Sequence, residues 1–156
     1  MDINDNLKSQ YAAAFAMLHQ AVEKCPAALW TDAACGNPFW MVAYHILFYT
    51  HLYAHPRLED FKPWVKCRRG PERFQPGGEP YSKAEILEFW DLCSAQIGPL
   101  VDAAALDAES GFHWLPFNRL EAHMYNIRHL QHHVGELCER LGVVTHVEVG
   151  WVIKTN

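Results

Sequence analysis

The segment 37–54 constrains the fold most, because its side chains are apolar on nearly every side. It reads NPFWMVAYHILFYTHLYA. Asn37 is a good N-cap and Pro38 suits the first helical position, so together they predict where a helix begins. Pro56 predicts that this helix ends at about Ala54. A helix without a polar face has to be buried all round, so we expect it inside a helical domain or in a dimer contact.

Three other segments show helical patterns. Apolar residues at steps of three and four predict a helix from about Asn4 to Lys24. Ser82 and Glu85 form a capping box, which predicts the start of a helix that reaches about residue 105. A last helix is predicted over about 117–141, with Gly142 as its C-cap. The tail VVTHVEVGWVIKTN is rich in β-branched residues, and we expect it to be extended and to cover an end of the domain.

The stretch 55–81 separates the second and third of these helices. It contains Pro56, Pro63, Pro71, Pro76 and Pro80. Its aromatic residues indicate that it folds back over the domain instead of linking two domains. Four helices with one long connection are typical of a bundle. We therefore predict an all-α protein: one domain over 1–156, a four-helix bundle with a long crossover loop between helices 2 and 3 and a short extended C-terminal tail.

Charge and composition argue against several classes of protein. The net charge is −5, and the only basic cluster is KCRRG, which is no footprint for nucleic acid. No apolar run reaches the roughly 18 residues that a membrane span needs. The five cysteines form no C-x-x-C pair. We therefore expect reduced thiols and a cytoplasmic protein, with no disulfide framework and no cysteine-based zinc site.

Ten histidines are the one clear excess in the composition. His129 and His133 are four residues apart, so on a helix they share one side and can chelate one divalent ion. The glutamate of the H-E-x-x-H zinc proteases is absent between them, which excludes that class. On a helical wheel the pair lies off the expected dry stripe, which places it in solvent or in a cleft between helices. That stripe consists of Leu120, Met124, Ile127, Val134, Cys138 and Leu141.

A chelating pair needs a third ligand from another element. His45 is the best candidate because it lies in the middle of the apolar segment, although a buried, hydrogen-bonded core histidine is the alternative interpretation. His123 lies near the dry stripe and is expected in the core, whereas His132 is expected in solvent. Three imidazoles would leave open positions on Zn²⁺, Ni²⁺, Fe²⁺ or Mn²⁺, and the spacing does not select among these ions.

The pieces WMVAYHILFYTHLY and RHLQHHVGEL resemble the motifs of the DinB-like four-helix metalloprotein family. The resemblance implies that His45, His129 and His133 hold a divalent metal ion. It also implies a homodimer and, for some members, S-transfer that uses a low-molecular-weight thiol. Two positions differ from the family pattern: Glu136 stands where glutamine is common, and Tyr125 stands where some members have another histidine.

Two interpretations from different classes follow. In the first, the protein is an enzyme, a transferase or hydrolase, in which a metal-activated thiol or water attacks a small molecule. Tyr49, Trp40 and Trp90 are then candidates for the pocket wall, and His132, Glu136 or Tyr125 for general acid–base work. In the second, the bundle binds a metal or a partner without catalysis. An open pocket beside the ion would favour the enzyme.

Overall fold

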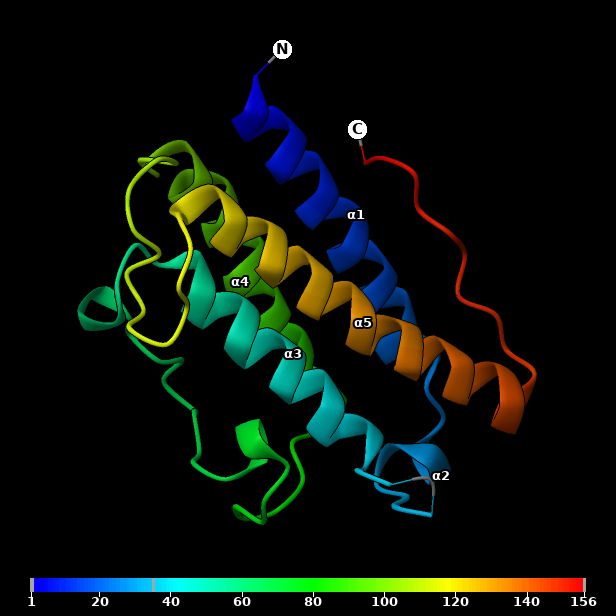
Figure 1. Ribbon diagram of the computed structural model, residues 1–156. Coiled ribbons are helices and arrows are strands. Elements are labelled where there is room, and N and C mark those ends of the chain that lie inside the picture. The colour runs from blue at the N-terminus through cyan, green and yellow to red at the C-terminus, as the bar shows by residue number, and fades with distance from the viewer. Residues whose placement is uncertain (1, 35, 156) are drawn as a thin grey trace.

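Four long helices lie side by side in the computed structural model, which describes residues 2–34 and 36–155 (Figure 1). They are α1 (Ile3–Lys24), α3 (Phe39–Ala54), α4 (Lys83–Asp102) and α5 (Arg119–Thr145). A short helix, α2 (Ala27–Trp30), follows α1, and the 3-10 turns η1 (Leu58–Asp60) and η2 (Pro71–Arg73) lie in the crossover. Within the described residues there is no β-strand. The expected all-α bundle is confirmed.

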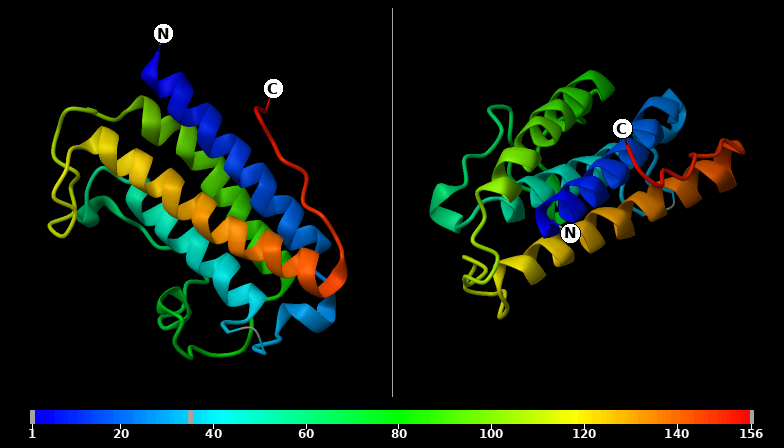
Figure 2. Two further views of the ribbon diagram at one scale, coloured as in Figure 1. Left: turned by 45° about the vertical axis from the view of Figure 1, so that its right-hand side comes forward. Right: turned by 90° about the horizontal axis from the view of Figure 1, so that it is seen from above.

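The helices form a four-cornered arrangement in which α1 and α3 each contact both α4 and α5. Figures 1 and 2 show α3 and α4 running in the same direction. A 16-residue helix is about 24 Å long, so the chain has to travel back along the bundle before α4 can begin. That direction explains why the proline-rich crossover is long.

The apolar segment is buried inside the chain's own bundle, as one of the two expectations stated. All residues of α3 are buried except Phe48 and Tyr49. It lies against α4, α5 and η2. The apolar surface of α3 is therefore covered without a second copy, and the dimer expected on that ground stays a prediction.

The capping box is confirmed, while the start of α3 differs from expectation. The Ser82 side chain accepts from the Glu85 backbone N–H, and the Glu85 carboxylate accepts from the Ser82 N–H. At the start of α3, Pro38 with ψ 148° occupies the N-cap position and Phe39 is the first helical residue. The prediction of Asn37 as N-cap was therefore wrong by one residue.

The last helix begins later and ends later than predicted. Asn118 caps it by accepting from the Glu121 N–H at 2.9 Å, so the start is Arg119 and not residue 117. At the other end His146 takes the left-handed conformation, with φ 58°. Gly142 lies inside the helix, and its prediction as C-cap was wrong because the left-handed residue comes four positions later.

The buried face of α5 is also rotated from the predicted stripe. Met124 is 59% exposed. Polar residues take its place in the core, where each has a hydrogen-bond partner for at least one of its side-chain atoms. His123 Nδ1 lies 3.2 Å from the Tyr11 hydroxyl, as a core histidine should, and Asn126 Nδ2 donates to the Thr50 carbonyl at 2.9 Å. This rotation turns the side bearing His129 and His133 toward α3.

The C-terminal tail runs along α1 and does not cover an end of the bundle (Figure 1). Lys24 Nζ donates to the Glu148 carbonyl at 2.8 Å, and the Gly150 N–H donates to Gln20 Oε1 at 3.1 Å. Among the described helices, none is both long and apolar enough to cross a membrane.

Candidate metal centre

Three histidines predicted as ligands come together between α3 and α5. One nitrogen from each of His45, His129 and His133 lies within 4.8 Å of the other two. The closest pair is His45 Nε2 and His129 Nε2, at 3.0 Å. The ring centroids of His45 and His133 are 4.6 Å apart. Helical spacing places the α5 pair on one side, and the antiparallel packing of α3 brings the third ring to them.

The crossover fixes the tautomer of His45. Its Nδ1 lies 2.7 Å from the backbone carbonyl oxygen of Glu72. A carbonyl can only accept, so Nδ1 carries the proton and Nε2 keeps a free lone pair. On one face of the imidazole the Phe74 ring stacks at 4.2 Å and 19°. Burial lowers the pKa of His45 to about 4, so the ring is neutral at pH 7.

A carboxylate fixes the tautomer of His133. Its Nδ1 lies 2.6 Å from Glu136 Oε2, and a carboxylate accepts, so Nδ1 carries a proton and Nε2 is the nitrogen of His133 that can face a metal ion. The other carboxylate oxygen of Glu136 lies 3.3 Å from His132 Nε2, on a side chain that is 66% exposed. The group His132, His133 and Glu136 also has metal-ligand spacing, but its polar atoms already pair with one another at the surface.

His129 is the ring whose hydrogen bonding is incomplete. Its Nε2 faces His45, and its buried Nδ1 has no hydrogen-bond partner among the described residues. Burial, with a smaller effect of the neighbouring histidines, lowers the pKa of His129 to about 3. Three imidazoles that converge, with Nδ1 of two of them held by a carbonyl or a carboxylate, are a donor set that fits a divalent transition-metal ion.

The η2 turn presents both crossover contacts to His45. Gly70 with φ +116° opens the turn, and its N–H donates to Glu72 Oε2 at 2.7 Å. Phe74 closes it with φ 57°, an unusual conformation for a bulky side chain. Gly77 packs so closely that a Cβ there would lie 2.2 Å from the Pro71 ring. The glycines and prolines of this stretch predicted a loop over the bundle, but no signal in the sequence identified Glu72 and Phe74.

Clefts lie on two sides of the histidine cluster. One, of about 540 Å³, is lined by Tyr49, Glu72 and Arg73 together with aromatic residues. The other, of about 470 Å³, is lined by Phe74, His133 and Glu136. His133 is therefore the ring of the three that forms part of a cleft wall.

The expected pocket-wall residues divide into two groups. Tyr49 lies beside the cluster, with its ring 4.9 Å from that of His45 and 5.7 Å from that of His129. Trp40 instead packs on Tyr81 in the core, and Trp90 packs on α1. Neither tryptophan has a ring contact with the three histidines.

The candidates for acid–base work also differ in position. Glu136 touches His133, and His132 lies next to Glu136 at the surface. Tyr125 packs against Tyr53 and Phe117, away from the three rings. Glu136 contacts His133 through a hydrogen bond, and the His132 ring packs edge-on against the His133 ring at 4.9 Å, so Glu136 and His132 both contact the cluster.

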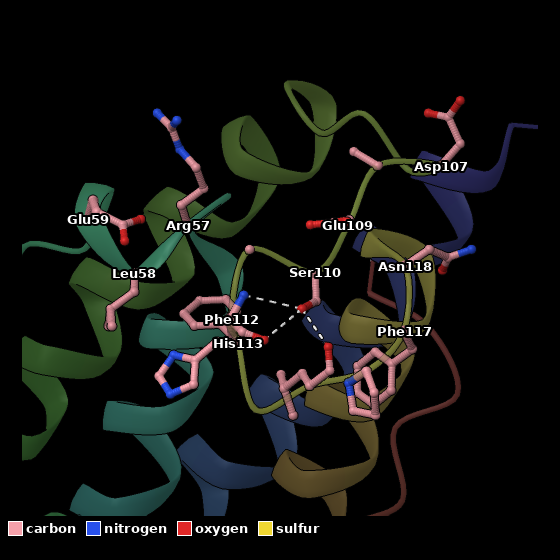
Figure 3. Close-up of a pocket in the computed structure, with 14 residues that line it drawn as sticks. Arg57, Leu58, Glu59, Asp107, Glu109, Ser110, Phe112, His113, Phe117 and Asn118 are labelled. Atoms are coloured by element: carbon pink, nitrogen blue, oxygen red, sulfur yellow. Dashed lines mark hydrogen bonds between the residues drawn. The ribbon is translucent and has the colours of Figure 1, made fainter.

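A separate pocket lies between η1 and the loop 107–118 (Figure 3). Ser110 is at its centre, and its hydroxyl donates to the backbone carbonyls of Phe112 and Leu115. Arg119 is buried nearby and donates to the carbonyls of Tyr53 and Ala54 at the end of α3. These bonds hold the loop and the end of α3 in place, and none of the three clustered histidines lines the pocket.

The family model of the DinB superfamily matches residues 10–137, which include all three histidines. A comparison with curated proteins and another with solved structures each found no match.

Proposed function

Because the chain belongs to the DinB superfamily, we propose that it is a metal-dependent enzyme that acts on a small molecule, as a thiol S-transferase or a hydrolase. His45, His129 and His133 hold the divalent ion. One observation carries the proposal: the Glu72 carbonyl and the Glu136 carboxylate engage Nδ1 of two rings, and one nitrogen of each of the three rings lies within 4.8 Å of the other two. Three protein ligands with open positions are typical of catalytic sites.

The residues around the ion have different roles in this proposal. A divalent ion in such a site lowers the pKa of a bound water or thiol and polarises a substrate oxygen. Glu72 and Glu136 orient their histidines through Nδ1. Tyr49 and Phe74 pack on the faces of His45 and exclude water there. Glu136 and His132, at the surface, are placed to exchange protons with solvent.

A bundle that binds metal without catalysis is the second candidate. The stacking of Phe74 on His45 favours it, because the aromatic ring covers one side of the cluster. The cleft walled by His133 favours the enzyme.

Metal content tests what the two candidates share. We expect about one divalent ion per chain in the purified protein, the stoichiometry of a single three-histidine site. His129→Ala and His133→Ala should each lose most of it, because two imidazoles bind far more weakly than three. His132→Ala, which changes an exposed neighbour in the same helix, is the matched control and should keep the ion. Elemental analysis showing metal-free protein after growth with zinc and nickel would overturn both candidates.

Turnover then separates the candidates. The metal-loaded protein should transfer a low-molecular-weight thiol to small electrophiles or hydrolyse small esters and amides, and His133→Ala should abolish the activity. A protein that keeps its ion and shows no turnover across such a screen would support the non-catalytic bundle.

A further inference from the structure

The crossover concentrates positive charge in an otherwise acidic chain. Residues 57–73 carry six of the thirteen Lys and Arg residues, although the net charge is −5. Three of the six already have partners. Arg57 pairs with Asp60, and Lys66 pairs with Glu88. Arg68 donates to the Glu79 carbonyl and lies over the Tyr81 ring.

Arg68, Arg69 and Arg73 line one cleft, which we call the arginine cleft. It is about 480 Å³ in volume, and its walls include Phe48, Phe61, Arg69, Glu72, Arg73 and Gln75. Arg69 is exposed and has no salt bridge to a described acidic residue. Arg73 is 72% exposed, and its Nε lies 3.9 Å from Glu72. Glu72 is itself buried and accepts from the Gly70 N–H, so the cleft has an excess of positive charge at its rim.

The arginine cleft leads toward the histidine cluster. Phe48, Phe61, Glu72 and Arg73 line both this cleft and the neighbouring one that contains Tyr49. Tyr49 in turn packs on His45 and His129. A ligand held at the arginines can therefore lay an apolar body over the two phenylalanines and point its other end toward the three histidines.

We propose that the arginine cleft binds the anionic end, a carboxylate or a phosphate, of the small molecule on which the histidine site acts. The inference rests on the proposed function for the identity of that molecule, but the binding itself needs no metal. Guanidinium groups bind both anions through paired N–H donors. The aromatic walls Phe48 and Phe61 favour a ligand whose anionic group is attached to an apolar body.

Binding of matched probes tests the cleft directly. Naphthoate, naphthylmethylphosphonate and the neutral naphthamide share one apolar body and differ in charge. In titrations followed by NMR, the anion that binds more tightly should have an affinity at least about fivefold higher than that of the amide. This is the size of effect expected of exposed ion pairs. The anion that binds tighter identifies the carboxylate or the phosphate as the natural group. Arg69→Gln combined with Arg73→Gln should reduce the preference to about onefold, because the amide side chains carry no charge and Arg68 is held by the Glu79 carbonyl and the Tyr81 ring.

Two further variants make the test decisive. Arg57→Gln removes an arginine of the same segment that lies outside the cleft, and it should keep the preference for the anion. His129→Ala should keep it as well, so that failure of the metal site and failure of the cleft are told apart. Equal binding of anions and amide to the wild type, or equal loss in Arg57→Gln, would overturn the proposal. So would shifted NMR signals confined to the apolar groove lined by Ile3 and Met124.

Discussion

At the scale of the residue, Glu136 can support His133 in two ways, through a hydrogen bond and through its negative charge, and two variants separate these effects. Oε2 lies 2.6 Å from the ring Nδ1. Glu136→Gln keeps a side-chain oxygen that can accept the same proton, so we expect metal affinity within a few-fold of the wild type. Glu136→Leu removes the acceptor and should weaken binding about tenfold or more. Competition with a chromophoric chelator measures both values. If the glutamine variant loses as much as the leucine variant, the charge and not the hydrogen bond supports the site.

Phe74 makes a second prediction at this scale. Its ring stacks on His45 at 4.2 Å, while its backbone has φ 57°. Phe74→Ala and Phe74→Gly both remove the ring, but only glycine relieves the backbone strain. We expect both to weaken metal binding about tenfold, the usual effect of losing a group that orients a ligand. Phe61→Ala, which removes a ring that does not touch the cluster, should leave the affinity unchanged. A normal affinity in Phe74→Gly would show that the turn matters and the ring does not.

The three histidines could be predicted from the sequence, whereas their supports could not. Helical spacing and one histidine in an apolar segment are local patterns, and the family resemblance joined them. The bond to His45 comes from a backbone carbonyl of Glu72, and any residue type supplies such a carbonyl. Only the path of the crossover decides which one reaches the ring, and that path depends on packing between segments far apart in the sequence.

At the scale of the element, a substitution at Gly142 tests whether α5 ends at Gly142, as predicted, or at His146, as the structure has it. It lies inside the helix, and a Cβ built on it would have no neighbour within 4 Å. Gly142→Ala should therefore raise the free energy of unfolding by about 0.5–1 kcal/mol, since alanine favours helix over glycine. Urea denaturation measures the change. A loss of stability would instead show that Gly142 is left-handed and ends the helix.

Gly111 provides the opposite control for this substitution. It has φ +81°, and an added Cβ would lie in contact with the backbone of Pro56. Gly111→Ala should therefore destabilise the fold by about 1–3 kcal/mol. The comparison shows that the position of a glycine, and not its presence in the sequence, decides what it does.

Helix ends were predicted less well than helix existence, for a physical reason. The Ser82–Glu85 pair is a reciprocal cap that depends on local residues alone, and it was found. The end at His146 needs a left-handed conformation that histidine adopts only occasionally. The buried face of α5 was also predicted incorrectly, because Arg119 and Asn126 enter the core only where backbone carbonyls of α3 accept their hydrogen bonds.

At the scale of the whole molecule, the sequence predicted the bundle but not what covers α3. Its apolar surface required burial, and either a second chain or the same chain could supply it. The structure shows that α4, α5 and the crossover do so. The prolines predicted a long connection, yet the parallel course of α3 and α4 that makes it necessary is a property of the assembled bundle.

Buried neutral histidines should make the whole fold sensitive to acid. His123 is fully buried beside Tyr11 of α1 and near Arg119 of its own helix. Burial, with a smaller effect of Arg119, lowers the pKa of His123 to about 3. Above pH 6.5 neither state binds the proton. Below pH 6.5 the unfolded chain binds a proton at His123 and the folded chain does not. The free energy of unfolding therefore falls as the pH falls, by about 1.4 kcal/mol per pH unit for this group.

His123→Asn removes that titration, so its stability should respond less to acid than that of the wild type. The variant will be the less stable protein at pH 7, because it loses the contact with Tyr11. Between pH 6.5 and pH 5 the gap, which is the difference in free energy of unfolding between the wild type and the variant, should narrow by about 2 kcal/mol. Urea denaturation at several pH values, with a chelator present to remove any contribution of bound metal, measures the gap. His132→Asn changes a histidine that is 66% exposed, and its free energy of unfolding should depend on pH as that of the wild type does. A gap for His123→Asn that stays constant with pH would mean that the folded protein takes up the proton at this ring, which its burial argues against.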